Sequence, residues 1–294
     1  MRDFSNAVVV ITGAGSGIGR ALAMEFASRG AQLALADVNT AALEETRSLL
    51  GNAKAGTYMV DVGDASSMEA FARKVRQDFG RVSILVNNAG VALYGVFEEL
   101  SLADFEWLFR INFWGVIHGC KFFLPLLRQE KEARQEEGAR QEKEARIVNI
   151  SSVFGLIAPP GQTAYGSSKY AVRGFSESLR EELRGSGVSV SCVHPAGVST
   201  NIANQARAAA ASDAKGQEQA RELFNRVAVI TPQEAAATIV RGIEQDKDRI
   251  LIGADAYRMD RIARLFPARA GAMFANWMGK RREKMVRAMS AGKG

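Results

Sequence analysis

The 294-residue sequence contains few of the residues on which several protein classes depend. Its two cysteines, Cys120 and Cys192, are too few and too far apart in the chain for a disulfide framework or a metal cluster. Its two histidines, His118 and His194, do not form a ligand pair, so we expect no metal site. The longest apolar runs, such as residues 7–11, are far shorter than the ~20 residues of a membrane-spanning helix. Disulfide scaffolds, cysteine-based metalloproteins and membrane-spanning proteins are therefore not expected.

The composition, with 47% hydrophobic and 24% charged residues, is typical of a soluble globular protein, and the length suits a single domain. Residues 1–6 contain no apolar signal core, which together with the low cysteine content predicts a reducing compartment, most simply the cytoplasm. The formal net charge is +6, but residues 249–294 contain eleven basic and three acidic side chains. The rest of the chain is close to neutral, so we expect no nucleic-acid partner.

Short apolar runs alternate along the chain with amphipathic stretches. Because the runs are β-branched or continuously apolar, they are typical of strands covered on both faces. The alternation predicts a parallel sheet with right-handed crossovers and helices on both faces, and hence one doubly wound α/β domain over residues 1–252. The predicted strands are residues 8–12, 33–37, 58–62, 84–87, 147–151, 188–194 and 250–252. The predicted helices are residues 20–28, 41–50, 66–78, 102–128, 168–184 and 233–244.

Three segments lie outside this alternation. Residues 129–146 are three hexapeptides related to Gln-Glu-Lys-Glu-Ala-Arg, and we interpret them as a charged helical insertion, with a binding arm as the alternative. Residues 199–230 are rich in alanine and small polar residues and are interpreted as a substrate lid, with a surface helical pair as the alternative. Residues 253–294 form a basic amphipathic extension in which Pro267 separates two helices. We expect this extension to pack on its own domain or on a partner subunit; contact with an anionic membrane is the alternative.

The first predicted strand ends in a glycine-rich turn, Thr-Gly-Ala-Gly-Ser-Gly-Ile-Gly at residues 12–19, which opens a helix. Glycines here allow a tight turn and let backbone amides approach a pyrophosphate at the positive end of the helix. The second strand ends at Asp37, whose carboxylate suits the adenosine ribose hydroxyls of a dinucleotide and repels a 2′-phosphate. No lysine or arginine lies in the turn or directly after Asp37. The pattern favours NAD(H) over NADP(H), with a helix-capping Asp37 as the alternative.

A tyrosine and a lysine, Tyr165 and Lys169, are spaced to lie on one face of a helix. A nearby ammonium favours the ionised phenol, so we expect Lys169 to lower the pKa of Tyr165 toward neutral pH. A tyrosine of this kind exchanges a proton with an alcohol or carbonyl oxygen. Ser152 precedes Tyr165 by thirteen residues at the end of a predicted strand, and Asn-Asn-Ala-Gly closes another strand at residues 87–90.

These motifs occur in the order found in the short-chain dehydrogenase/reductase family, which the chain resembles over roughly residues 5–252. The shared motifs are T-G-x-x-x-G-x-G, N-N-A-G, the serine thirteen residues before the tyrosine, and Y-x-x-x-K. The resemblance implies a Rossmann-type sheet of about seven strands and an NAD(P)-dependent oxidoreductase. It also implies a homo-oligomer, a tetramer or a dimer, packed through the long helices that bear Asn112 and Tyr165.

The resemblance implies a role for each matching residue. Tyr165 would be the acid/base and Ser152 would hold the substrate oxygen, while Lys169 would bind the nicotinamide ribose and lower the pKa of Tyr165. Asn112 would support a water that relays the proton to solvent. Ala196 replaces a glycine of the family's P-G-x-V-x-T segment. The residues implied to contact the dinucleotide are Gly13, Ser16, Gly17, Ile18, Gly19, Asp37, Asp61, Val62, Asn88, Ala89, Gly90, Tyr165, Lys169, Pro195, Gly197, Val198 and Thr200.

The predicted reaction is the interconversion of a secondary alcohol and a ketone with NAD as the hydride carrier. Residues 153–160 and 91–94 are almost wholly apolar and follow two of the motifs, so we expect an apolar or lipophilic substrate. One alternative is an NADPH-dependent carbonyl or ketoacyl reductase, against which Asp37 argues. Another is a protein that binds the dinucleotide without turnover, against which the intact serine, tyrosine and lysine argue.

Overall fold

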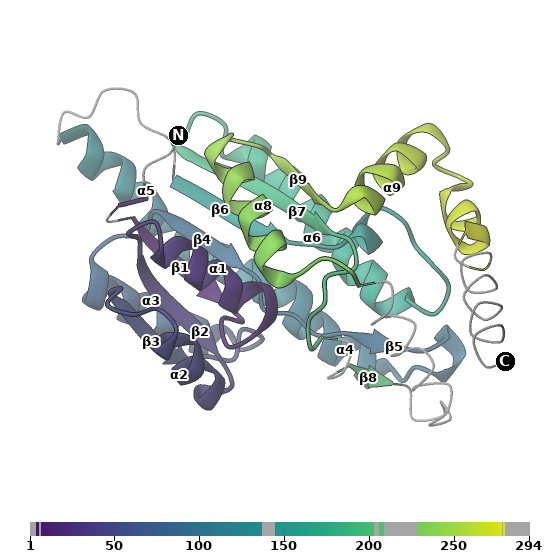
Figure 1. The fold of residues 1–294 in the computed structure, drawn as a ribbon, viewed down its shortest axis with the longest axis horizontal. Coiled ribbons are helices and arrows are strands. Elements are labelled where there is room, and N and C mark those ends of the chain that lie inside the picture. The colour runs from purple at the N-terminus through teal and green to yellow at the C-terminus, as the bar shows by residue number, and fades with distance from the viewer. Residues whose placement is uncertain are drawn as a thin grey trace, which may run out of the picture.

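Seven parallel strands form the central sheet (Figure 1): β1 (Val8–Thr12), β2 (Gln32–Asp37), β3 (Ala55–Met59), β4 (Ile84–Asn87), β6 (Ala145–Ile150), β7 (Val188–Pro195) and β9 (Arg249–Ile252). The structure, a computed structural model, describes residues 4–5, 7–136, 145–202, 206–208, 228–277 and 279. The strand order is β3-β2-β1-β4-β6-β7-β9, so the direction of winding reverses between β1 and β4. Ligands of such sheets bind at this reversal, outside the carboxyl ends of the strands. The predicted doubly wound α/β fold is confirmed.

Helices cover both faces of the sheet. They are α1 (Gly17–Ala27), α2 (Thr40–Ser48), α3 (Ala65–Phe79), α4 (Leu102–Phe109), α5 (Gly115–Glu136), α6 (Thr163–Glu182), α8 (Pro232–Glu244) and α9 (Ala254–Leu265). Val9 and Ile11 of β1 pack in the hydrophobic cluster that contains α1 and α8. Val10, between them, packs in the cluster that contains α3, α5 and α6. All three side chains are fully buried, which explains why this strand has a continuous apolar sequence.

The third strand is displaced from its predicted position. It was expected at residues 58–62, but β3 ends at Met59. As an edge strand, β3 has half-buried side chains and a correspondingly weak apolar pattern. Val60 and Val62, directly after it, are buried under neighbouring elements, and their apolar character shifted the predicted strand toward them.

The long helix expected over residues 102–128 is interrupted. A π-helical turn at Arg110–Trp114 separates α4 from α5. The helix expected from residue 168 begins earlier, at Thr163, so that Tyr165 lies in its first turn. Apolar periodicity alone does not distinguish a π-turn from a continuous helix, because both keep the same face buried over such a short stretch.

The predicted insertion at residues 129–146 begins as a continuation of α5, which ends at Glu136. Its last two residues, Ala145 and Arg146, belong to β6 rather than to a helix. Residues 137–144 of the predicted insertion lie outside the described residues.

The predicted lid at residues 199–230 is described at its two ends and at residues 206–208. Its short strand β8 (Arg207–Ala208) pairs in parallel with β5 (Leu93–Tyr94), which follows the Asn-Asn-Ala-Gly motif. The rest of this segment lies outside the described residues.

The C-terminal extension contains two helical segments, α9 and residues 270–277, with Pro267 in the turn between them, as predicted. Both segments pack on the chain itself, because Met259 and Phe274 are buried in one hydrophobic cluster with residues of the 3₁₀-helix Val153–Gly155. None of the helices in the described part of the chain is long and apolar enough to cross a bilayer.

We expect Gly119→Ala to lower the free energy of unfolding by about 1–3 kcal/mol, since overpacking of a buried contact costs this much. Gly119 faces β4 from α5, and an added Cβ would lie 2.0 Å from Oδ1 of the buried Asn87. The matched control is Gly174→Ala in α6, where an added Cβ meets no atom within 4 Å. It should stabilise by about 0.5–1 kcal/mol through helix propensity. Urea denaturation measures both, and equal effects of the two substitutions would contradict this packing.

Candidate active site

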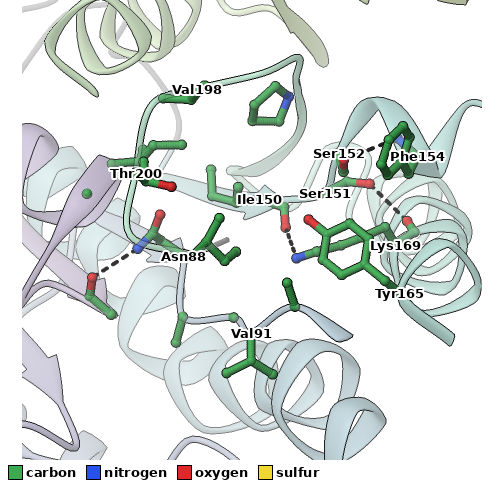
Figure 2. A pocket seen from close by; sticks show the side chains of 18 of the residues that line it. Asn88, Val91, Ile150, Ser151, Ser152, Phe154, Tyr165, Lys169, Val198 and Thr200 are labelled. Carbon is green, nitrogen blue, oxygen red and sulfur yellow. Dashed lines mark hydrogen bonds between the residues drawn. The ribbon is translucent and has the colours of Figure 1, made fainter. Parts of the chain in front are cut away.

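A cavity of about 400 Å³ lies at the carboxyl ends of the strands, where the winding of the sheet reverses (Figure 2). Every predicted site residue lines it except Gly19 and Asn112. The predicted residues that line it are Gly13, Ser16, Gly17, Ile18, Asp37, Asp61, Val62, Asn88, Ala89, Gly90, Ser152, Tyr165, Lys169, Pro195, Gly197, Val198 and Thr200.

The glycine-rich turn forms one end of this cavity, and its geometry requires glycine. Gly13 has a φ of 65° and an added Cβ would lie 2.8 Å from Cα of Ala89. Gly17, at the start of α1, has a φ of 51°. Gly19 lies behind the turn, where an added Cβ would be 2.1 Å from the Gly13 carbonyl oxygen. Gly19 therefore supports the turn through close packing rather than by facing the cavity.

Asp37, at the end of β2, faces the same end of the cavity. Its carboxylate accepts hydrogen bonds from the backbone amides of Gly15, at 2.9 Å, and of Asn39, at 3.0 Å. The nearby Arg20 does not line the cavity; its guanidinium pairs with Glu45 at 2.8 Å. The two amides hold the carboxylate in place and leave it able to accept further hydrogen bonds.

The Asn-Asn-Ala-Gly segment joins the ends of β4 and β1. The Asn88 side chain donates to the carbonyl oxygens of Thr12, at 3.0 Å, and Gly13, at 3.1 Å. In return, the Thr12 hydroxyl accepts from the backbone amides of Asn88 and Ala89. These reciprocal bonds fix the glycine-rich turn against the neighbouring strand.

Asn112 lies in the π-turn, fully buried and behind the cavity wall. Its side-chain oxygen accepts from the Val91 amide at 2.8 Å, and its side-chain nitrogen donates to the Val91 carbonyl at 3.0 Å. Both bonds hold the segment that follows Asn-Asn-Ala-Gly. Its side-chain nitrogen also lies 3.3 Å from the hydroxyl of Ser168 in α6, the residue before Lys169, so Asn112 contacts the helix of the predicted catalytic residues without lining the cavity.

Ser152, Tyr165 and Lys169 meet at the other end of the cavity. The Lys169 ammonium donates to the Ile150 carbonyl at 3.1 Å and lies 5.7 Å from the centre of the Tyr165 ring (Figure 2). Ser152 is the second residue after β6, and its hydroxyl accepts from the Phe154 amide at 3.1 Å. The Ser152 hydroxyl lies close enough to the Tyr165 phenol to act on its pKa. The serine of one loop and the tyrosine of α6 thus converge on one point of the cavity wall.

The pKa of Tyr165 differs from the expected direction. Burial raises this pKa above its ordinary value, and the hydrogen bond with Ser152 only partly opposes the effect. Burial also lowers the pKa of Lys169 to about 8, because the residue is only 4% exposed. The ammonium is hydrogen-bonded to a carbonyl of β6, and burial is the main influence on the pKa of the phenol. The expectation that Lys169 lowers the pKa of Tyr165 is therefore not met in this arrangement.

Several residues of the site are absent from the predicted set. His194 is fully buried, with Nδ1 3.1 Å from the Ser152 carbonyl oxygen, and burial lowers its pKa to about 4, so the imidazole is neutral. Part of the cavity wall comes from the C-terminal extension, beyond all of the motifs. The lining residues of this extension are Asp255, Met259, Phe274 and Trp277. The apolar helix face at residues 273–278 indicates burial, but it does not indicate against which part of the molecule.

A doubly wound sheet with a glycine-lined cavity at its reversal point defines the class of Rossmann-type nucleotide-binding proteins. Within that class, the chain belongs to the short-chain dehydrogenase/reductase family, because the family model for short chain dehydrogenases matches residues 7–211. SadH of Mycobacterium tuberculosis, a protein named as an oxidoreductase, is 41% identical over 271 residues, which cover 90% of this chain and 92% of SadH. The D-threitol dehydrogenase of Mycolicibacterium smegmatis is 34% identical over 250 residues, 84% of this chain and 89% of that protein.

A solved structure shares the same architecture. The short-chain dehydrogenase/reductase from Burkholderia phymatum, in complex with NAD, is 33% identical and superposes with a TM-score of 0.80. The superposition covers 90% of this chain and 95% of that protein. The chain is therefore an oxidoreductase of this family, and a structural relative within the family binds NAD.

The lowered pKa of Lys169 predicts a pH dependence of stability. The unfolded lysine keeps its proton up to about pH 10.4, whereas the folded one loses it near pH 8. Between these values the unfolded state binds more protons, so the free energy of unfolding should rise with pH by about 1 kcal/mol per pH unit. Lys169→Met should lack this rise. Urea denaturation at pH 7 to 9.5 measures the difference between the two proteins, and a constant difference would show that the buried lysine keeps its proton.

Proposed function

We propose that the protein interconverts a secondary alcohol and a ketone with NAD(H), using Tyr165 as the general acid/base. The observation that carries the proposal is the convergence of Ser152, Tyr165 and Lys169 in the cavity that also contains the glycine-rich turn and Asp37. The hydroxyls of Ser152 and Tyr165, which would hold the substrate oxygen, thus line the same cavity as the turn that would bind the dinucleotide. The relatives named above support this reaction class through their names as an oxidoreductase and a dehydrogenase.

The residues at the turn fit a nicotinamide dinucleotide. The glycines leave the backbone amides at the start of α1 open to the cavity, where a pyrophosphate is stabilised by a helix N-terminus. Asp37 would accept hydrogen bonds from the adenosine ribose, and Lys169 would donate to the nicotinamide ribose. When bound, the nicotinamide supplies the acceptor or donor of hydride. Since Asp37 would repel a 2′-phosphate, we propose NAD(H) in preference to NADP(H).

Tyr165 and Ser152 would hold the reacting oxygen of the substrate between their hydroxyl groups. The raised pKa keeps Tyr165 protonated at neutral pH, which suits the donation of a proton to a ketone oxygen. In the opposite direction, the phenolate is needed to remove the proton of an alcohol. Alcohol oxidation should therefore become faster as the pH rises. The His194 ring would position Ser152 by its contact with the serine carbonyl.

We also propose that the protein forms a homo-oligomer, as the family resemblance implies. Three large apolar side chains around α4 and α5 are exposed: Phe97 at 64%, Leu102 at 79% and Trp114 at 51%. Exposed apolar side chains near these helices suit a subunit contact that would cover them.

Tyr165→Phe should reduce the turnover of any alcohol substrate by about 1000-fold or more, because general acid/base catalysis contributes this much. Binding of NADH, followed by its fluorescence, should change by less than about threefold, since the ring and the cavity wall are kept. Tyr170→Phe is the matched control: Tyr170 lies in the same helix, is 38% exposed and does not line the cavity. Near-normal rates for Tyr165→Phe would rule out the proposed role of the phenol.

Asp37→Asn should lower the preference for NAD⁺ over NADP⁺, measured as the ratio of the two kcat/KM values, by about tenfold. The substitution removes the charge that would strengthen the hydrogen bond to the NAD⁺ ribose, and with it the charge that would repel the 2′-phosphate of NADP⁺. The variant keeps an acceptor for the Gly15 amide, so the turn should remain folded. Glu44→Gln in the exposed face of α2 removes the same charge away from the cavity and serves as the control. A wild-type enzyme that prefers NADP⁺ would overturn the proposed cofactor preference.

A further inference from the structure

We infer that the C-terminal extension, described here over residues 253–277, forms the specificity wall of the substrate site and selects uncharged substrates with a bulky apolar group. This inference rests on the proposed function, because it names the substrate class of the same cavity. Its residues lie beyond residues 7–211, the part of the chain that matches the family model.

An aromatic row leads from the predicted catalytic tyrosine into the extension. The ring of Tyr165 meets that of Phe154 edge to face, with centroids 6.3 Å apart. Phe154 meets Phe274 at 6.0 Å, and Phe274 meets Trp277 at 5.8 Å. All four side chains line the cavity. Aromatic rings at these distances and angles present edges and faces that suit another ring or an alkyl group. A substrate whose oxygen lies at Tyr165 would thus extend its carbon skeleton along this row.

The extension that carries the aromatic row packs firmly on the rest of the chain. Phe274 is 7% exposed and Met259 is 8% exposed. Both belong to a hydrophobic cluster with Val153 and Ile157, which lie one and five residues after Ser152 in sequence. The extension therefore packs on the same loop that carries the predicted substrate-binding serine. Trp277, at the end of the row, remains 37% exposed, so a bound apolar group would bury surface there that water now covers.

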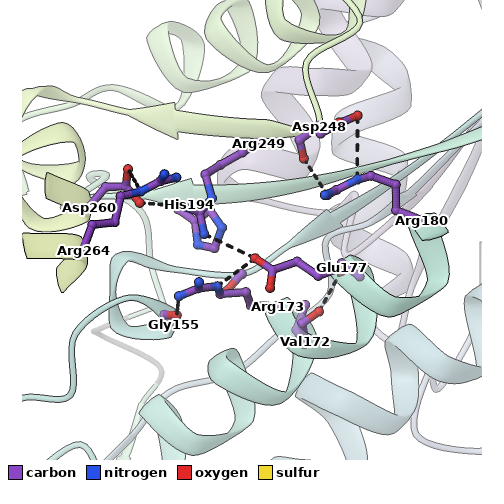
Figure 3. A network of polar contacts seen from close by, with 12 residues as sticks. Gly155, Val172, Arg173, Glu177, Arg180, His194, Asp248, Arg249, Asp260 and Arg264 are labelled. Atoms are coloured by element: carbon purple, nitrogen blue, oxygen red, sulfur yellow. Dashed lines mark hydrogen bonds and ion pairs between the residues drawn. The ribbon is translucent and has the colours of Figure 1, made fainter. Parts of the chain in front are cut away.

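Ion pairs fix the extension to the sheet and to α6 (Figure 3). Asp260 of α9 pairs with Arg249 of β9 at 2.6 Å, and its side chain is only 13% exposed. Arg249 also contacts Glu177 of α6 at 3.3 Å. Glu177 in turn pairs with Arg173, which donates to the Gly155 carbonyl at 3.4 Å. The network connects α9, the sheet, α6 and the loop after Ser152, and so holds the wall in a defined position relative to Tyr165.

The charges around the cavity favour an uncharged substrate. Among the described lining residues, Lys169 is the only lysine or arginine, and its ammonium is bound to the Ile150 carbonyl. The acidic lining residues are Asp37, Asp61 and Asp255, the last of which lies in the extension. Among the residues that the structure describes, no cation lines the aromatic row for a carboxylate or phosphate of the substrate, and Asp255, which pairs with Arg258 at 3.2 Å, adds a carboxylate to this wall. A ring or branched alkyl group would instead replace water against the rings.

The experiment compares two alcohols that differ only by a phenyl group, 2-butanol and 4-phenyl-2-butanol, as substrates with NAD⁺. We expect the wild-type enzyme to favour the phenyl compound by at least tenfold in kcat/KM. Trp277→Ala should reduce this ratio by about tenfold, mainly through the phenyl compound, whereas Trp277→Phe should retain most of it. Tyr257→Ala is the matched control, because Tyr257 is an exposed aromatic residue of α9 that does not line the cavity. An equal preference for both alcohols, or a ratio unchanged in Trp277→Ala, would overturn the inference.

A binding measurement separates failure of this inference from failure of the proposed function. In the Tyr165→Phe background, calorimetric titration with 4-phenyl-2-butanone in the presence of NADH measures affinity without turnover. We expect the dissociation constant to rise about tenfold on adding Trp277→Ala and to stay within twofold on adding Tyr257→Ala. If no alcohol is oxidised but this difference is found, the specificity wall stands and the proposed reaction is wrong. If alcohols are oxidised but the ketone binds equally to both variants, the proposed reaction is supported and the inferred role of the extension is wrong.

Discussion

The hydrogen bond between the Lys169 ammonium and the Ile150 carbonyl is the contact on which the arrangement of the site depends. A buried ammonium is costly unless it is hydrogen-bonded, and this one finds its partner at the carboxyl end of β6. The helix α6 must therefore dock on the sheet at the register that brings Lys169 to that carbonyl. Tyr165, one helical turn earlier, is then carried to the end of the same strand, beside Ser152. The Ser151 hydroxyl adds a second link, since it donates to the Lys169 carbonyl at 2.9 Å.

The strands and the dinucleotide end of the cavity could be predicted from the sequence because their signals are local. A buried parallel strand has a continuous apolar run, and the turn after β1 needs glycine at positions with positive φ, as at Gly13 and Gly17. Where the signal is weak, the prediction was wrong: the edge strand β3 lies three residues before its expected start. The π-turn around Asn112 also has no apolar signature of its own.

The direction of the Tyr165 pKa could not be predicted, because it depends on tertiary burial. The spacing of Tyr165 and Lys169 places both on one helix face, but it does not say how deeply that face is buried. In the folded chain both groups are desolvated, which raises the pKa of the phenol and lowers that of the ammonium. Burial also explains why the His194 ring is neutral. In the sequence, His194 is distinguished only by its place before Pro195. Its neutral ring and its contact with the Ser152 carbonyl follow from the packing of β7.

The two ends of the cavity are built in different ways, which would separate cofactor chemistry from substrate choice in the proposed reaction. The proposed dinucleotide end is formed by the glycine-rich turn and by residues at the carboxyl ends of strands, so its geometry is tied to the sheet itself. The opposite end consists of side chains on the loop after Ser152 and on the C-terminal extension, which contact each other in a separate hydrophobic cluster. Exchanging Phe274 or Trp277 would reshape that end without moving a strand, because neither residue packs in the two clusters that cover the sheet. If the extension acts as inferred, such a division would let it change the accepted substrates while the glycine-rich turn, Asp37 and Tyr165 keep the same positions.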